Sequence, residues 1–193
     1  MNTRQLPKTF DDFLDLSNEI SSKEYLSYIY DLVIKKYDFN TLRDEDTNET
    51  LLFIASNDYI LLEAIKRGFD CNNADIDNNT VFNNKNKPLY PKSFKYALTN
   101  GLIDFTILSK DGTVFHNPKY KQLLEFGLEN GFDPNLCDRD GNTVFHCIEN
   151  EKVILLKAIE KGLNINKKNN NGRTILFDNM HLLKVLVNKG ANM

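Results

Sequence analysis

A histidine and a cysteine stand side by side in this sequence, at His146 and Cys147, and these residue types can form a nucleophile with its general base. Adjacent residues on a helix point about 100° apart, so the two side chains would not meet easily. Another histidine, His181, has no accompanying motif, and the chain contains no Gly-rich phosphate-binding loop. We therefore predict no catalytic residues and a protein that is not an enzyme.

Metal binding is the second chemistry that these residue types could support. The stretch D-I-D-N-N (75–79) is faintly similar to a calcium-binding loop, but it lacks the glycine and the distal glutamate of an EF-hand. The cysteines, Cys71, Cys137 and Cys147, show no metal-like pairing, and their odd number favours reduced thiols in the cytoplasm. We therefore expect no metal and no cofactor.

Composition and charge argue against several classes of partner. Apolar residues make up 41% and charged residues 26% of the 193 residues, as in ordinary globular proteins. The formal net charge is -3, whereas a nucleic-acid-binding protein needs a basic face. No apolar run approaches the roughly 18 residues of a membrane span, and the N-terminus lacks the apolar core of a signal peptide. We expect a cytoplasmic protein that binds neither nucleic acid nor membranes.

A repeated pattern organises the chain. The sequence K-D-G-T-V-F-H (110–116) returns as D-R-D-G-N-T-V-F-H (138–146). Threonines at equivalent places are separated by 30, 33, 30 and 31 residues, at Thr50, Thr80, Thr113, Thr143 and Thr174. Each of the last four follows a glycine by 12 residues, and these glycines are Gly68, Gly101, Gly131 and Gly162, with Gly190 as a fifth. Such a constant spacing indicates a structural unit that is built several times.

The residues between these marks predict a pair of helices in each unit. The positions three and seven before each glycine are apolar, which places them on one helical face: Leu61 and Ile65, Phe94 and Leu98, Leu124 and Leu128, Leu155 and Ile159, Leu183 and Val187. The glycine suits the residue after a helix, and the threonine suits an N-cap. Asp, Asn and Gly between them favour a tight turn.

This unit resembles the ankyrin repeat, with its Asp-x-x-Gly-x-Thr-Pro-Leu-His start and its Leu-Leu-x-x-Gly-Ala end. It departs from that pattern because no proline follows the threonine, and four of the five units are shorter than the usual length, so we expect clipped helices. The resemblance implies an all-α solenoid of antiparallel helix pairs with hairpin-like turns. It also implies that the rings of His116 and His146 bond the backbone and the threonine hydroxyl.

We expect residues 1–193 to form a single repeat domain. Residues 44–193 hold about five repeats, of which the last is truncated, and residues 1–43 form an N-terminal capping pair of helices, at 9–16 and 21–36. The segment 83–93 breaks the pattern, because Pro88 and Pro91 are incompatible with a regular helix. We expect an irregular, exposed loop there, which is either a degenerate unit or a surface shaped for a partner.

The resemblance implies that hairpin tips and first helices form a concave face that holds another protein. The residues that we expect to contact it are Glu45, Asp46, Asp77, Asp111, Arg139 and Asp140 at the tips, and Glu149 and Asn150 beyond the fourth threonine motif. Two interpretations of the acidic tips stay open. They either keep the tips solvated or complement a basic partner, which would mainly raise the association rate.

The sequence thus favours a protein-binding module that is a monomer when free. Its size and the lack of another domain favour a stoichiometric inhibitor, such as an immunity protein that covers a toxin, or an adaptor. One alternative is an effector that engages a protein of a host cell. Another, from a different class, is an enzyme built on the solenoid.

Overall fold

The computed structural model describes residues 22–35, 38–41, 43–50, 52, 57–84, 86, 88–147 and 152–192. Over these ranges the chain forms helices, turns and isolated β-bridges, which confirms the predicted all-α class. Contacts divide the chain into two compact units, the first made of Met1–Phe82 with Asn86–Leu102 and the second of Asn83–Lys85 with Ile103–Met193. None of the helices in the described ranges is long and apolar enough to cross a bilayer.

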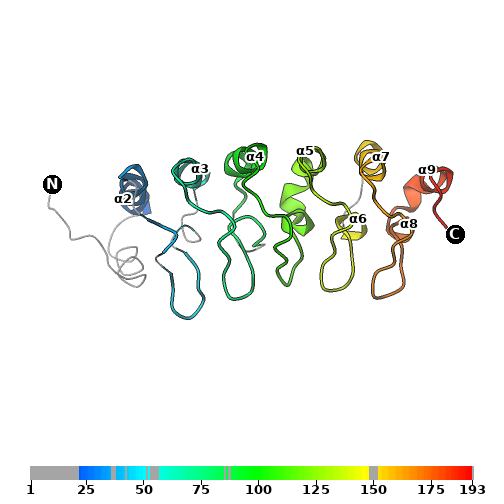
Figure 1. Cartoon of the computed structure of the whole chain (residues 1–193), viewed down its shortest axis with the longest axis horizontal. Helices are drawn as coiled ribbons and strands as arrows, with labels where there is room; N and C mark the ends of the chain where they lie inside the picture. The colour runs from blue at the N-terminus through cyan, green and yellow to red at the C-terminus, as the bar shows by residue number, and fades with distance from the viewer. Residues whose placement is uncertain are drawn as a thin grey trace. The chain divides into compact units, whose positions relative to one another are not determined.

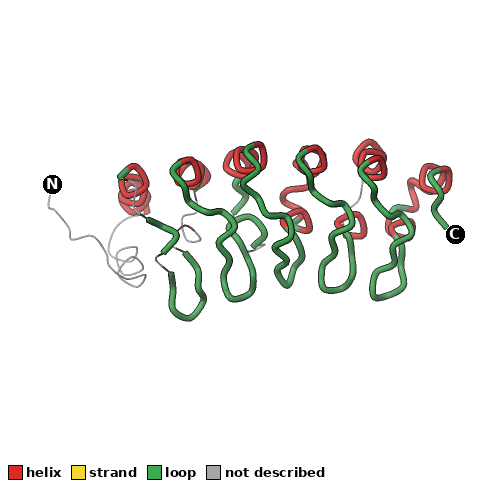
Figure 2. Tube along the Cα trace, viewed as in Figure 1, coloured by secondary structure: helices red, strands yellow, loops and turns green. Residues whose placement is uncertain are grey.

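The first unit contains three long helices that lie side by side. These are α2 (Ser22–Ile34), α3 (Asp58–Lys66) and α4 (Pro91–Thr99), and α3 packs against both of the others (Figure 1). Hairpin-like loops project from one side of this row (Figure 2). Helix α2 confirms the predicted helix at 21–36, whereas the predicted helix at 9–16 lies outside the described residues.

The second unit places short helices next to the hairpins and longer helices on the opposite side (Figure 1). The short ones follow the threonines: η2 (Val114–His116), α6 (Val144–Cys147) and α8 (Ile175–Asp178). The others are η3 (Pro118–Leu123), α5 (Leu124–Glu129), α7 (Lys152–Glu160), η4 (Met180–Leu182) and α9 (Leu183–Asn188). Helix α6 packs on η2 and α8, and α5 packs on α7. The predicted clipping of the first helices is confirmed.

A glycine with positive φ ends each of the helices α3, α4, α5, α7 and α9, as predicted. The φ angles lie between 65° and 100° at Gly68, Gly101, Gly131, Gly162 and Gly190. After α7, the Gly162 N–H donates to the Ile159 carbonyl at 3.0 Å and the Leu163 N–H donates to the Ala158 carbonyl at 2.9 Å. These two bonds satisfy carbonyls that the helix itself leaves without a partner.

The predicted apolar faces are correct in the early repeats and only partly correct in the last two. Leu155 is buried but Ile159 is half-buried, while Val187 is exposed and Leu183 is half-buried. The position four before each glycine is buried in every repeat, and it holds Ala64, Ala97, Gly127, Ala158 and Leu186. A small residue at this position lets neighbouring helices approach closely, and in the last repeat Leu186 takes the inward place expected for Val187.

The irregular segment has no helix at its described positions between residues 81 and 90, as the prolines predict. Helix α4 begins at Pro91, where the missing N–H is not needed. Pro88 and Leu89 are exposed, but Asn83, Asn84 and Tyr90 are buried, and residues 91–93 belong to α4. The irregular, exposed loop expected over 83–93 is therefore wrong at both of its ends and correct only around Pro88 and Leu89.

Candidate functional site

A side-chain oxygen at the start of each turn shapes the hairpin tips, and it belongs to a carboxylate or amide except at Ser109, whose hydroxyl accepts the Asp111 N–H at 3.2 Å. The Asp138 Oδ1 atom accepts the N–H groups of Asp140 and Asn142 at 2.9 and 2.8 Å. Asp75 and Asn169 make the same pair of bonds in their own hairpins. Asp44 acts similarly, and bonds from the Thr47 hydroxyl and N–H hold the pKa of its carboxyl below the usual value. The side chains of these residues therefore stabilise the turn, and the residues that follow them form the exposed surface of the tip.

The exposed tip residues in the first unit are Glu45, Asp46 and Asp77. Their two hairpins are neighbours, because the Ile76 N–H donates to the Thr47 carbonyl at 3.0 Å. In the second unit Arg139 and Asp140 are exposed and Asp111 is half-buried. The two other predicted contact residues, Glu149 and Asn150, lie outside the described residues. The binding role of this tip set (Glu45, Asp46, Asp77, Asp111, Arg139 and Asp140) stays a prediction.

His116 joins its repeat to the next one. Its Nδ1 atom accepts the Thr113 N–H at 3.1 Å and lies 2.9 Å from the Thr113 hydroxyl. A nitrogen that accepts an N–H carries no proton, so the ring is the Nε2–H tautomer, and Nε2 donates to the Asn142 carbonyl at 2.9 Å. Thr113 and His116 thus form the capping box of η2, which confirms the role implied for the ring.

His146 repeats this arrangement one repeat later. Its Nδ1 atom accepts from the Thr143 N–H at 3.1 Å, and its Nε2 atom donates to the Arg173 carbonyl at 3.2 Å. Burial lowers the pKa of His146, although the Arg173 carbonyl opposes that shift. The ring therefore serves as a neutral joint between repeats and is not oriented as a base for Cys147. At Thr174, where Phe177 replaces the histidine, no such capping bond forms.

The structure brings together a cluster of His116, Asp138 and Cys147 that the sequence did not reveal. Their potential ligand atoms lie within 4.8 Å of one another, and the Cys147 Sγ is 3.9 Å from Asp138 Oδ2. Both His116 ring nitrogens are already bonded, and Asp138 Oδ2 accepts an N–H of the Asn142 side chain at 3.1 Å. Binding a cation would compete with these bonds, of which the one from His116 Nε2 to the Asn142 carbonyl joins two repeats, so the cluster is a structural joint.

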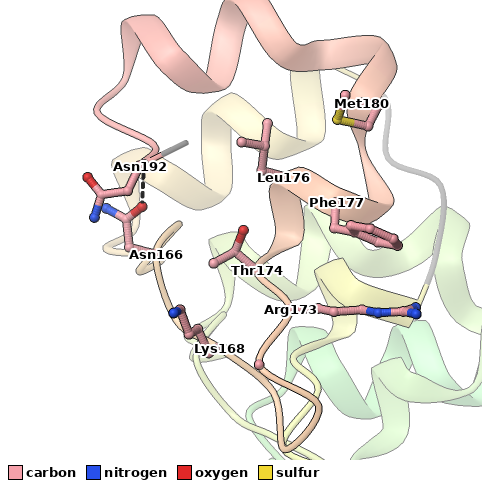
Figure 3. Close-up of a pocket in the computed structure, with 9 residues that line it drawn as sticks. Asn166, Lys168, Arg173, Thr174, Leu176, Phe177, Met180 and Asn192 are labelled. Carbon is pink, nitrogen blue, oxygen red and sulfur yellow. Dashed lines mark hydrogen bonds between the residues drawn. The ribbon is translucent and has the colours of Figure 1, made fainter.

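A hollow of about 410 Å³ lies in the last repeat (Figure 3). It contains two exposed cationic residues, Lys168 and Arg173, and two large apolar side chains, Phe177 and Met180, each 58% exposed. The Arg173 guanidinium carbon lies 4.3 Å from the centre of the Phe177 ring. The remaining lining residues are Asn166, Gly172, Thr174, Leu176 and Asn192. Sequence reasoning missed this hollow, although the replacement of His by Phe177 in the repeat pattern was a signal.

Comparison with known proteins places the fold. Neither a protein-family model nor a curated protein matches the sequence. The structure is similar to the crystal structure of EF0377, an ankyrin repeat protein, with a TM-score of 0.60 and 19% sequence identity. The match covers 93% of this chain and 97% of the other. Together with the glycine stops, the hairpins and the Thr–His joints, this likeness shows that the chain has the ankyrin-repeat fold.

Proposed function

We propose that this protein is a non-enzymatic binding module that holds another protein against its tip set, and that it acts as a stoichiometric inhibitor. The observation that carries the proposal is that some residues of each hairpin hold the turn, while others expose their side chains at defined positions. Asp75 and Asp138 hold the turns, while the side chains next to them, such as Asp77 and Asp140, project from fixed backbone positions. Such a surface loses little conformational entropy on binding.

Bonds between neighbouring hairpins support this view because they hold the tips rigidly. In the second unit the Asn170 N–H donates to the Asp140 carbonyl at 2.9 Å, and the Asn170 side chain donates to the Arg139 carbonyl at 3.0 Å. The backbone that carries the side chains of Arg139 and Asp140 is therefore held in place before a partner arrives.

The reactive side chains support a role without catalysis. His116 and His146 are used in joints between repeats. Burial raises the pKa of the Cys71 thiol to about 12, which keeps it protonated and poorly nucleophilic at neutral pH. A partner-binding surface accounts for the exposed tips, and it requires no chemical reaction at these histidines or at Cys71.

The acidic members of the tip set favour a basic partner. Five of its six residues, all except Arg139, are carboxylates, and opposite charges at an interface rim raise the association rate. An inhibitor that covers a basic binding or catalytic face of its target would use this chemistry. We propose that the free chain is a monomer and that one copy covers one partner.

The test compares two matched pairs of charge reversals. One variant combines Asp77→Lys with Asp140→Lys on the tips, and the control combines Asp31→Lys with Glu160→Lys on helices α2 and α7. Each pair takes one exposed acidic residue from each unit, so the change in net charge is the same. A partner is captured on the wild-type chain, identified by mass spectrometry, and its association rate is measured at low and high salt.

We expect the tip variant to slow association at least about tenfold at low salt, and we expect added salt to reduce the difference. The control variant should associate like the wild type. Equal slowing in both variants would contradict a binding surface at the tips. The inhibitor role requires that the activity of the partner falls to a plateau at one equivalent of the chain, and a partner that stays active in the complex would contradict it.

A further inference from the structure

The hollow in the last repeat occupies the place where, one repeat earlier, the following hairpin stacks. Residues 167–173 cover the fourth repeat through several bonds between hairpins. The Asn169 side chain donates to Asn142 Oδ1 at 2.7 Å, and His146 Nε2 donates to the Arg173 carbonyl. Thr143 and Thr174 are equivalent positions of the fourth and the last repeat, 31 residues apart. The positions that the next hairpin covers in the fourth repeat correspond to residues that line the hollow in the last one.

Two residues that make these stacking bonds are replaced in the last repeat. Arg173 stands at the place of Asn142, and Phe177 stands at the place of His146. A phenylalanine ring cannot donate a hydrogen bond to the carbonyl of another hairpin. The side chain of Phe177 is instead 58% exposed, with the Arg173 guanidinium over its ring. The surface is therefore suited to an occupant with different chemistry from that of a repeat hairpin.

The lining residues define that chemistry by their charge. Lys168 and Arg173 are both exposed, and no carboxylate lines the hollow. An arginine whose plane rests on an aromatic ring keeps its N–H groups at the edge, where they can bind a carboxylate in bidentate fashion. The Asn166 side chain donates to the Gly190 carbonyl at 3.0 Å and accepts the Asn192 N–H at 2.7 Å, so this wall is held in place (Figure 3).

We propose that this hollow binds a segment of a partner protein in which a carboxylate side chain lies next to an apolar side chain. The carboxylate contacts Lys168 and Arg173, and the apolar group packs on Phe177 and Met180. The inference rests on the proposed binding function and adds a second, basic contact site to the acidic tips. It predicts that the partner carries both a basic and an acidic–apolar surface.

The experiment uses the full chain labelled with ¹⁵N and three blocked peptides as probes. The first probe is acetyl-Gly-Ser-Glu-Leu-Glu-Gly-amide, the second has lysine in place of both glutamates, and the third has glycine in place of leucine. Binding is followed through the backbone amide signals of Gly172, Arg173 and Phe177. We expect the first peptide to shift these signals saturably, with an affinity at least about tenfold higher than that of either other peptide.

Variants with matched charge changes test the residues. Lys168→Glu with Arg173→Glu should abolish binding of the first peptide and permit binding of the lysine peptide. The control, Lys184→Glu with Lys189→Glu, changes two exposed lysines in or beside α9 and should bind like the wild type. Lys168→Gln with Arg173→Gln, which is milder, should weaken binding of the first peptide as well. Thermal unfolding of each variant checks that the fold persists.

Several results would overturn the inference. These are equal binding of the glutamate and lysine peptides, no change in the three amide signals, or equal loss of binding in the control variant. The exposed Ile76 between Asp75 and Asp77 makes a second copy of this chain another candidate occupant. Light scattering over a range of concentrations tests whether the chain self-associates. Self-association that is lost in Lys168→Glu/Arg173→Glu would show that the occupant is a second copy and would contradict binding of a partner segment. If the tip variants release a captured partner but these variants do not, the proposed function stands and this inference fails.

Discussion

The Asp58 carboxylate of helix α3 caps the helix that carries Ser93 in the next repeat. Its Oδ1 atom accepts the Ser93 N–H at 2.9 Å, its Oδ2 atom accepts the Lys92 N–H at 2.9 Å, and the Ser93 hydroxyl donates to the Asp58 carbonyl at 2.7 Å. The residue before α4, Tyr90, makes no capping bond with its side chain. The repeat interrupted by prolines therefore takes its helix cap from its neighbour.

Loss of this cap should destabilise the first unit. Asp58→Ala removes both accepted N–H bonds and a negative charge at a helix N-terminus, so we expect the free energy of unfolding to fall by about 1 to 2 kcal/mol. Asp31→Ala, at an exposed site on α2, is the control and should change it by less than about 0.5 kcal/mol. Chemical denaturation measures both, and a double-mutant cycle with Ser93→Ala should show coupling. Strict additivity would contradict the bond from the Ser93 hydroxyl to Asp58 Oδ1.

A glycine inside α5 is required by close packing. A Cβ atom at Gly127 would overlap the ring of Phe115, which is fully buried and lies 4.7 Å from the Phe132 ring, centroid to centroid. Alanine normally stabilises a helix interior relative to glycine by up to about 1 kcal/mol. We expect the opposite sign here, a loss of about 1 to 3 kcal/mol for Gly127→Ala. Calorimetry should show that Phe115→Leu reduces this loss, and a stabilised Gly127→Ala variant would contradict the contact.

The inward face of α7 supplies a third test. Leu155 is fully buried, so Leu155→Ala should lower the free energy of unfolding by about 2 to 5 kcal/mol. Ile159 is half-buried, and Ile159→Ala should cost less than Leu155→Ala. Lys168→Ala changes an exposed hairpin residue and should stay within about 0.5 kcal/mol. Urea denaturation of the three variants would reveal a wrongly assigned face if Lys168→Ala equalled Leu155→Ala.

Stability should depend on pH through His146. Burial lowers its pKa in the folded chain below the usual 6.5, so the unfolded chain binds the extra proton first. The contribution of His146 to the free energy of unfolding is fully present above pH 6.5. It is lost as the pH falls toward and through the pKa of His146 in the folded chain. We expect the melting temperature to fall on acidification, and His146→Gln should flatten this part of the profile. An unchanged slope in His146→Gln would contradict the assignment.

The cysteines should differ in their reaction with iodoacetamide. Cys71 is buried and its thiol pKa is raised to about 12, and its Sγ donates to the Leu102 carbonyl at 3.5 Å. Cys147 is exposed in the second unit. Mass spectrometry should find Cys147 modified in the native chain and Cys71 modified only after denaturation. Rapid labelling of Cys71 in the native chain would show that this core opens.

The repeat unit could be predicted from the sequence alone, because the glycines, threonines and prolines that define it affect only the backbone near them. Gly68, Gly131 and Gly162 end their helices since a positive φ is inexpensive for glycine. The spacing from glycine to threonine sets the length of the hairpin, and the prolines at 88 and 91 exclude a regular helix before α4. These effects need no knowledge of the neighbouring repeats, so the helix pairs and the fold could be predicted from the pattern.

Only the tertiary structure decided which side chains serve the stack and which remain available for binding. Asp75 and Asp77 are the same residue type two positions apart in one hairpin tip, yet one holds the turn and the other is exposed. The cap from Asp58 to Ser93 joins residues 35 positions apart, and the hollow at Arg173 and Phe177 combines side chains of the hairpin, of α8 and of the segment after α9. The roles of Asp75 and Asp77 depend on the backbone conformation of the hairpin, and the cap and the hollow depend on contacts between residues far apart in the sequence. A spacing rule for residue types carries no information about either.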